Sequence, residues 1–255
     1  MNSPTQYPLL VCVLSFIALW LAAWGGWAFR RRQGALDAEL REDFGFILAA
    51  TLTLLGLIIG FTFSMATSRY DQRKNYEEAE ANAIGTEYVR ADLLPAADGA
   101  KVRPLLKDYI DQRILFYTTR DPREIKQINS RTAQLQSELW AAVLPAAAAQ
   151  PTQIVALVVS GMNDVLNSQG YTQAAWWNRI PPGAWILMAV IAIGCNLLVG
   201  YRARKPKAEG MLLMVLPVLV SVAFFLIADI DSPNGGVIRV APQNLISLAE
   251  SWRGP

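Results

Sequence analysis

The charged side chains best placed to act on an ion stand where long apolar stretches of the sequence end. Arg69 and Asp71 follow one such stretch, and Asp229 and Asp231 follow another. A ring of arginines at the mouth of a pore would attract anions and repel cations. Two carboxylates two residues apart could instead hold a cation, or pair with Arg69 of a neighbouring helix.

Both groups also have a simpler explanation. Arg69 could run along an apolar surface and place only its guanidinium group in water, while Asp71 pairs locally on a solvated helix. Asp229 and Asp231 could mark the polar end of a membrane helix, since unpaired carboxylates would not be drawn into hydrocarbon. Three glutamates that follow shortly afterwards would also cancel much of the positive field around Arg69: Glu77, Glu78 and Glu80.

Catalytic motifs are missing from the sequence. The chain has no histidine, and it shows no phosphate-binding loop, no nucleophile elbow and no metal-ligand spacing. Its two cysteines, Cys12 and Cys195, lie in separate apolar stretches, so neither a disulfide nor a zinc site is predicted. We therefore expect no enzyme, no cofactor and no metal site. The formal net charge of +2 gives no reason to expect nucleic-acid binding.

Four uncharged apolar segments determine the expected architecture. They are Pro8–Phe29, Phe44–Ser68, Ala184–Tyr201 and Met211–Ala228. A helix needs about 20 apolar residues to cross the hydrocarbon core of a bilayer. Backbone polar groups cannot be left unpaired in lipid, so each segment is predicted to be a transmembrane helix. The fold class is therefore an all-α membrane protein with four spans.

The polar residues 69–183 predict a helical extramembrane domain inserted between the second and third spans. No loop signal separates residues 44–68 from the sequence that follows, so we expect one helix to continue to about residue 94. Asp121 followed by Pro122 predicts a helix start, and Pro145 is expected to end that helix. Residues 229–255 form a C-terminal tail after the fourth span.

Positive charges in the short loops predict an orientation in the membrane. Residues 30–43 and 202–210 each carry four basic side chains, which are Arg30, Arg31, Arg32 and Arg41 in the first and Arg202, Arg204, Lys205 and Lys207 in the second. Short basic loops usually stay in the cytoplasm. The charge count therefore places the middle domain and both termini on the opposite, periplasmic side.

Several motifs carry a resemblance to a known family. Within residues 54–94 these are GFTFS at 60–64, SRYD at 68–71 and EANAIG at 80–85. DIDSPNGG at 229–236 and IRVAP at 238–242 close the pattern. The sequence resembles the bacterial DUF4239 membrane family, also called bestrophin-like. The resemblance implies a multi-pass protein of the bacterial inner membrane.

Bestrophins themselves are similar at a greater distance. They share a Gly-Phe pair followed eight residues after the Phe by an Arg and an aromatic residue, here Gly60-Phe61 and Arg69-Tyr70. Bestrophins are pentameric anion channels with a large cytosolic domain, so the resemblance implies the orientation opposite to the charge count. No acidic run follows Gly236, so we expect no counterpart of the calcium site of animal bestrophins.

The resemblance assigns a hydrophobic neck to every fourth residue of the second span, namely Thr53, Leu57 and Phe61. These residues share one helix face, although Thr53 departs from the large apolar residue usual there. Five such faces could form a narrow constriction that gates by dewetting; the alternative is an ordinary stripe facing lipid or packing on a neighbour. Gly56 and Gly60 could allow close helix contact, or reflect the frequency of glycine in membrane helices.

The function expected from these observations is an oligomeric, anion-conducting channel. Its partners would be membrane lipid, inorganic anions and further copies of the chain, five in all by the resemblance. The alternative is a non-conducting membrane adaptor or stress sensor whose helical domain binds a partner protein. The balanced charge of that domain, thirteen basic and thirteen acidic residues between Arg69 and Arg179, is compatible with this second hypothesis.

Overall fold

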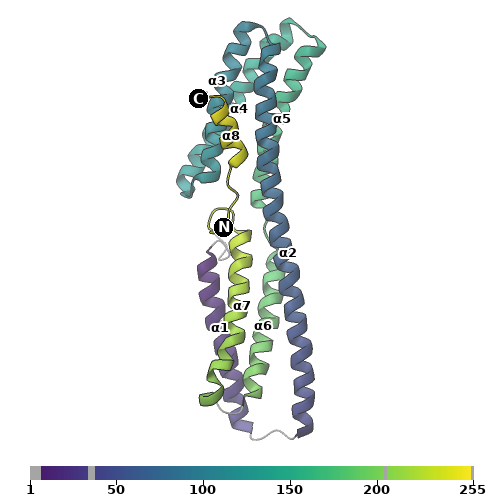
Figure 1. Cartoon of the computed structure of the whole chain (residues 1–255), viewed down its shortest axis with the longest axis vertical. Helices are drawn as coiled ribbons and strands as arrows, with labels where there is room; N and C mark the ends of the chain where they lie inside the picture. Colours follow the sequence, from purple (N-terminus) through teal and green to yellow (C-terminus); the bar gives the residue numbers. More distant parts are fainter. Residues whose placement is uncertain (1–6, 34–37, 204–205, 254–255) are drawn as a thin grey trace. The chain divides into compact units, whose positions relative to one another are not determined.

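The structure, a computed structural model, describes residues 7–33, 38–203 and 206–253, and every regular element within them is helical (Figure 1). The helices are α1 (Pro8–Gln33), α2 (Ala38–Arg90), the short 3₁₀ helix η2 (Ala91–Leu93), α3 (Ala96–Thr118), α4 (Pro122–Ala149), α5 (Gln153–Trp177), α6 (Pro182–Arg202), α7 (Pro206–Asp231) and α8 (Gln243–Ser251). The all-α prediction is thereby confirmed.

Four stretches of the described chain are long and apolar enough to cross a membrane, as the sequence predicts. The four uncharged segments fall within α1, α2, α6 and α7. Part of the predicted topology signal cannot be located: Arg204 and Lys205 lie outside the described residues, as do the side chains of Arg41 and Lys207.

The chain divides into two compact units. Residues 1–69 and 179–239 form the first, which we call the membrane unit because it holds the four uncharged segments. Residues 70–178 and 240–255 form the second, which we call the bundle unit. The single helix α2 contributes its first part to the membrane unit and its last part to the bundle unit.

Helix ends agree with local signals at some positions and not at others. Asp121 caps α4 as predicted, because its side chain accepts a hydrogen bond of 2.8 Å from the backbone N–H of Arg123. The prediction that Pro145 ends this helix is wrong, since α4 continues to Ala149. The alanines after Pro145 favour helix. The helix ends only at Gln150, because a residue that precedes a proline, here Pro151, is disfavoured in helical geometry.

In the membrane unit, α1 packs against α6 and α7 (Figure 1). Two glycines bring the backbones of α1 and α6 together. A Cβ atom added at Gly26 would strike the carbonyl oxygen of Leu197, and one added at Gly200 would strike the carbonyl oxygen of Ala23. Small residues permit this close approach, which is a main source of helix association in lipid.

The bundle unit is built around apolar side chains of α2, α3, α4 and α5. A charged pair lies inside it: Arg113 donates to the carboxylate of Glu80, and both side chains are fully buried. Tyr117 and Thr172 also donate to Glu80 Oε2, at 3.3 Å and 3.2 Å. A buried charge is tolerable only with such partners, because desolvation otherwise costs several kcal/mol.

Helix α8 is held to the bundle unit at both of its ends. Glu77 of α2 accepts hydrogen bonds of 3.0 Å from the backbone N–H groups of Asn244 and Leu245, so its negative charge faces the N-terminus of α8. Near the other end, the ring of Trp252 stacks on Tyr88 with the centroids 4.0 Å apart. The tail that follows the last span is therefore ordered around α8.

Candidate functional site

The first part of α2 has one face that packs inside the membrane unit. Its most buried residues recur at intervals of seven and four, and their exposed fractions are small: Leu48 7%, Leu55 2%, Thr62 4% and Ala66 0%. At about 100° per residue these positions share one side of the helix. This side therefore faces the other helices of the unit.

The three residues assigned to a neck lie on the opposite side of α2. At about 100° per residue, Thr53, Leu57 and Phe61 stand roughly 160–240° around the helix from Leu55. Leu57 is 52% exposed and Phe61 63% exposed. The hydroxyl of Thr53 donates to Ala49 of its own helix, at 2.9 Å. This face takes no part in packing within the membrane unit, so it is available to lipid, water or a second copy.

Gly56 and Gly60 lie beside this face and meet nothing in the structure. A Cβ atom added at either glycine would have no neighbour within 4 Å. Close helix contact inside the chain instead uses Gly26 and Gly200, which the sequence reasoning did not single out. The difference is physical, because the sequence shows which positions are small but not which sides of two helices meet.

The two carboxylates after the last span form the core of a tight turn. Asp229 accepts hydrogen bonds from the backbone N–H groups of Val237 and Ile238, at 2.8 Å and 2.7 Å. Asp229 is 2% exposed. Gly236 is required where the turn closes, since a Cβ atom there would strike the carbonyl oxygen of Asp229. The turn residues at 233–236 were a local signal for this arrangement.

Asp231 joins three parts of the membrane unit. Its carboxylate accepts from the backbone N–H of Ile180, at 3.1 Å, and lies 3.9 Å from the guanidinium of Arg69. Its backbone carbonyl accepts from Arg179, at 2.8 Å. Asp231 is 1% exposed. The structure thus brings Arg69 and Asp231 together, and no local sequence signal indicates the part that Arg179 and Ile180 play.

Most charged side chains of α2 beyond its apolar part are buried or bonded to other residues of the chain. Arg73 is only 2% exposed. Two of the three glutamates expected to cancel a positive field are also buried, since Glu77 caps α8 and Glu80 pairs with Arg113. The charged side chains of α2 that stay exposed in this region are Asp71, Lys74 and Glu78. Fewer exposed charges of either sign therefore remain there than the sequence alone indicates, and the electrostatic field around this part of α2 is correspondingly weaker.

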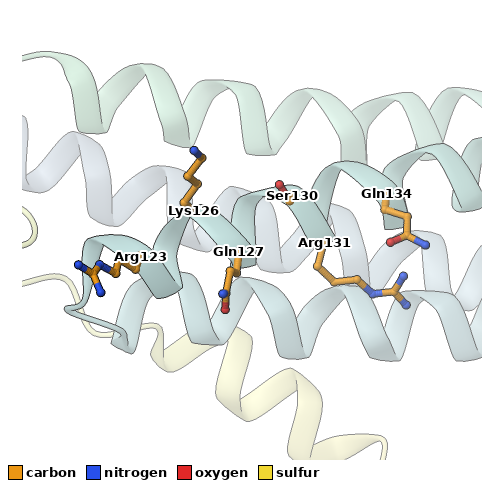
Figure 2. A pocket seen from close by; sticks show the side chains of 6 residues that line it. All are labelled: Arg123, Lys126, Gln127, Ser130, Arg131 and Gln134. Atoms are coloured by element: carbon orange, nitrogen blue, oxygen red, sulfur yellow. The ribbon is translucent and has the colours of Figure 1, made fainter.

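Figure 2 shows a hollow on the surface of α4, lined by Arg123, Lys126, Gln127, Ser130, Arg131 and Gln134. These side chains spread from one helix in different directions and do not converge on a point. Among the described residues, no three His, Cys, Asp or Glu side chains come together to hold a metal ion.

Comparison with protein families matches residues 15–245 to the Bestrophin-like domain. The fold is similar to the crystal structure of a bacterial bestrophin homolog from Klebsiella pneumoniae, with a TM-score of 0.60 at 13% identity over 95% of this chain and 98% of that one. A single-substitution variant of that homolog gives a TM-score of 0.62 at 13% identity, over 99% and 100%. Comparison with curated proteins gave no match.

Proposed function

The chain belongs to the bestrophin-like domain family, and on this premise we propose that it is the subunit of an oligomeric ion channel. The proposal is carried by one observation: the side of α2 opposite its packing face is exposed throughout the apolar stretch. In a closed ring of subunits, that side would line the conduit. The chain is a multi-pass membrane protein, and its remaining exposed apolar side chains would meet lipid.

The proposed constriction is made by Thr53, Leu57 and Phe61. Leu57 and Phe61 each expose more than half of their surface, and they contribute no charge. Rings of such side chains narrow a pore and exclude water until the pore widens. Thr53 adds a hydroxyl already bonded to its own helix, so it supports a wetter end of the constriction. Gly56 and Gly60 offer neighbouring subunits a surface for close helix contact.

We place Arg69, Asp229 and Asp231 at the mouth of this conduit as positioning residues. Their bonds hold the turn after α7 against the end of the apolar part of α2 and the start of α6. Anions are the permeant ions that the family resemblance favours. The exposed Asp71, Lys74 and Glu78 supply at most a small net charge, so the selection would depend chiefly on the neck.

The bundle unit is proposed to be the extramembrane domain. Its residues 70–178 carry 11 basic and 13 acidic side chains, which would be costly in hydrocarbon. The charge count of the short loops favours the periplasm of a bacterial inner membrane, whereas the family resemblance implies the cytosol. A single cysteine at the exposed position Ser130, in a chain lacking Cys12 and Cys195, would settle the side by labelling with a membrane-impermeant reagent.

The experiment that tests conduction uses the purified full-length chain in planar bilayers under a potassium chloride gradient. We expect single-channel currents, with a reversal potential close to the equilibrium potential of chloride. The subunit number should be measured on the same preparation by native mass spectrometry. A ring of several subunits that conducts supports the channel. Silent bilayers at high protein load, with a monomer or dimer in solution, would refute it and favour the adaptor.

A further inference from the structure

One buried carboxylate of the bundle unit, that of Glu87, takes part in none of the ion pairs and helix caps described above. Glu87 of α2 lies 19 residues after Ser68, roughly 28 Å further along the helix axis, and so lies outside the apolar stretch. Glu87 is fully buried, with 0% of its surface exposed. Neither carboxylate oxygen has a hydrogen-bond partner among the described residues. Glu77 and Glu80, by contrast, are buried and bonded.

The carboxylate of Glu87 lies against Gly161 of α5. A Cβ atom added at Gly161 of α5 would collide with Glu87 Oε2 and with Arg90 Nη1. Arg90 also donates to the carbonyl oxygen of Leu157 on α5, at 3.4 Å. Only glycine leaves space for these side chains at the contact. The carboxylate is therefore held against the α5 backbone without a donor to satisfy it, an arrangement that is costly for a charged group.

Two charged groups bear on the protonation of Glu87, one on its own helix and one on α5. Burial raises its pKa, Arg90 of α2 lowers it and Asp164 of α5 raises it, and together these effects bring the pKa to about 8. Asp92 of η2, which also packs on α5, is exposed and paired with Arg103. A protonated carboxyl group is thus favoured while the contact is closed, and an ionised one is favoured when water can reach it.

We propose that Glu87 makes the contact between α2 and α5 proton-dependent, so that the contact opens more readily as the pH rises. The reason is linkage: a closed contact retains a proton that an open contact releases to water. The equilibrium constant for opening the contact should rise about tenfold per pH unit from the ordinary titration range of glutamate up to about pH 8. Above that pH it should stay constant. The inference does not depend on conduction, because it concerns the bundle unit alone.

Hydrogen exchange of the full-length chain in nanodiscs tests this proposal between about pH 5 and about pH 9. After correction for the intrinsic exchange rate, protection of α5 around Gly161 should fall with pH and then level off. Glu87→Gln should keep its protection constant over the whole range. The exposed Glu78→Gln serves as the matched control and should retain the response of the unmodified chain. A flat profile in the unmodified chain, or a sloping one in Glu87→Gln, overturns the proposal.

Two further variants guard against a trivial loss of folding. Asp164→Asn removes a charge that favours the protonated form, so its protection should level off at a lower pH. Arg90→Gln removes a charge that favours the ionised form, so its protection should level off at a higher pH. A merely structural role for these residues would not shift the profile in opposite directions. Profiles that level off at an unchanged pH in both variants would overturn the proposal.

Discussion

The guanidinium of Arg69 lies 3.9 Å from the carboxylate of Asp231, and this pair joins α2 to the turn after α7. The same carboxylate accepts the backbone N–H of Ile180, just before α6. A single buried side chain therefore holds three segments that are far apart in the sequence. Its loss should affect the membrane unit as a whole.

Asp231→Asn should destabilise the membrane unit by about 3 kcal/mol, because it removes a buried negative charge that faces the guanidinium of Arg69 and accepts from the backbone N–H of Ile180. The measurement is the free energy of unfolding in mixed detergent micelles. Asp71→Asn is the matched control, since Asp71 is exposed, and its effect should stay within about 0.5 kcal/mol. Equal effects of the two substitutions would show that the pair has no structural importance.

Gly200→Ala should weaken the packing of α1 on α6 by about 1–3 kcal/mol, since the new methyl group would strike the backbone of Ala23. Gly194→Ala lies on the same helix and meets nothing within 4 Å, so it should be neutral or slightly stabilising. Reversible unfolding of both variants under the same conditions provides the comparison. A neutral Gly200→Ala would mean that the two backbones do not touch there.

Arg113→Met should destabilise the bundle unit by about 3–5 kcal/mol, because Glu80 would remain buried and lose its charged partner. Arg253→Met also removes an arginine from an ion pair, the one with Asp111, but that pair is largely exposed. Its loss should cost less than about 1 kcal/mol. Thermal unfolding followed by circular dichroism can rank the two variants, and the reverse order would contradict this account.

Phe61→Ala should raise the single-channel conductance or produce a leak, if the exposed face of α2 lines the conduit. Phe63→Ala is the matched control on the same helix. Phe63 is 42% exposed but stands roughly 160° around the helix from Phe61, given about 100° per residue. Recordings of both variants under identical salt should separate the two faces. Matching conductances in the two variants would remove Phe61 from the proposed neck.

The membrane helices and the start of α4 in the bundle unit could be predicted from sequence, because their signals are local. A run of apolar residues such as 184–201 needs no knowledge of its neighbours to be recognised as a span. Asp121 and Pro122 likewise define a helix start within a few residues. The prediction at Pro145 was wrong because the expectation that proline ends a helix ignores the residues that follow. Here the alanines after Pro145 continue the helix until Pro151 approaches.

The fate of the charged residues could not be predicted, because it depends on partners distant in sequence. Glu77 is bonded to Asn244 and Glu80 to Arg113, pairs separated by 167 and 33 residues. From sequence alone, both glutamates counted as exposed negative charge on α2. The side of α2 that packs inside the unit could not be predicted for the same reason. Leu55 and Leu57 are the same residue type, yet the fold buries Leu55 and leaves Leu57 exposed.

The anchoring of α8 has a practical consequence for the design of expression vectors. Trp252 stacks on Tyr88, and Arg253 lies 2.8 Å from Asp111 of α3, so residues 252 and 253 both contact the bundle unit. An affinity tag or fluorescent protein fused at this end should therefore be kept away from these two contacts. A flexible glycine–serine spacer should be inserted before any such tag.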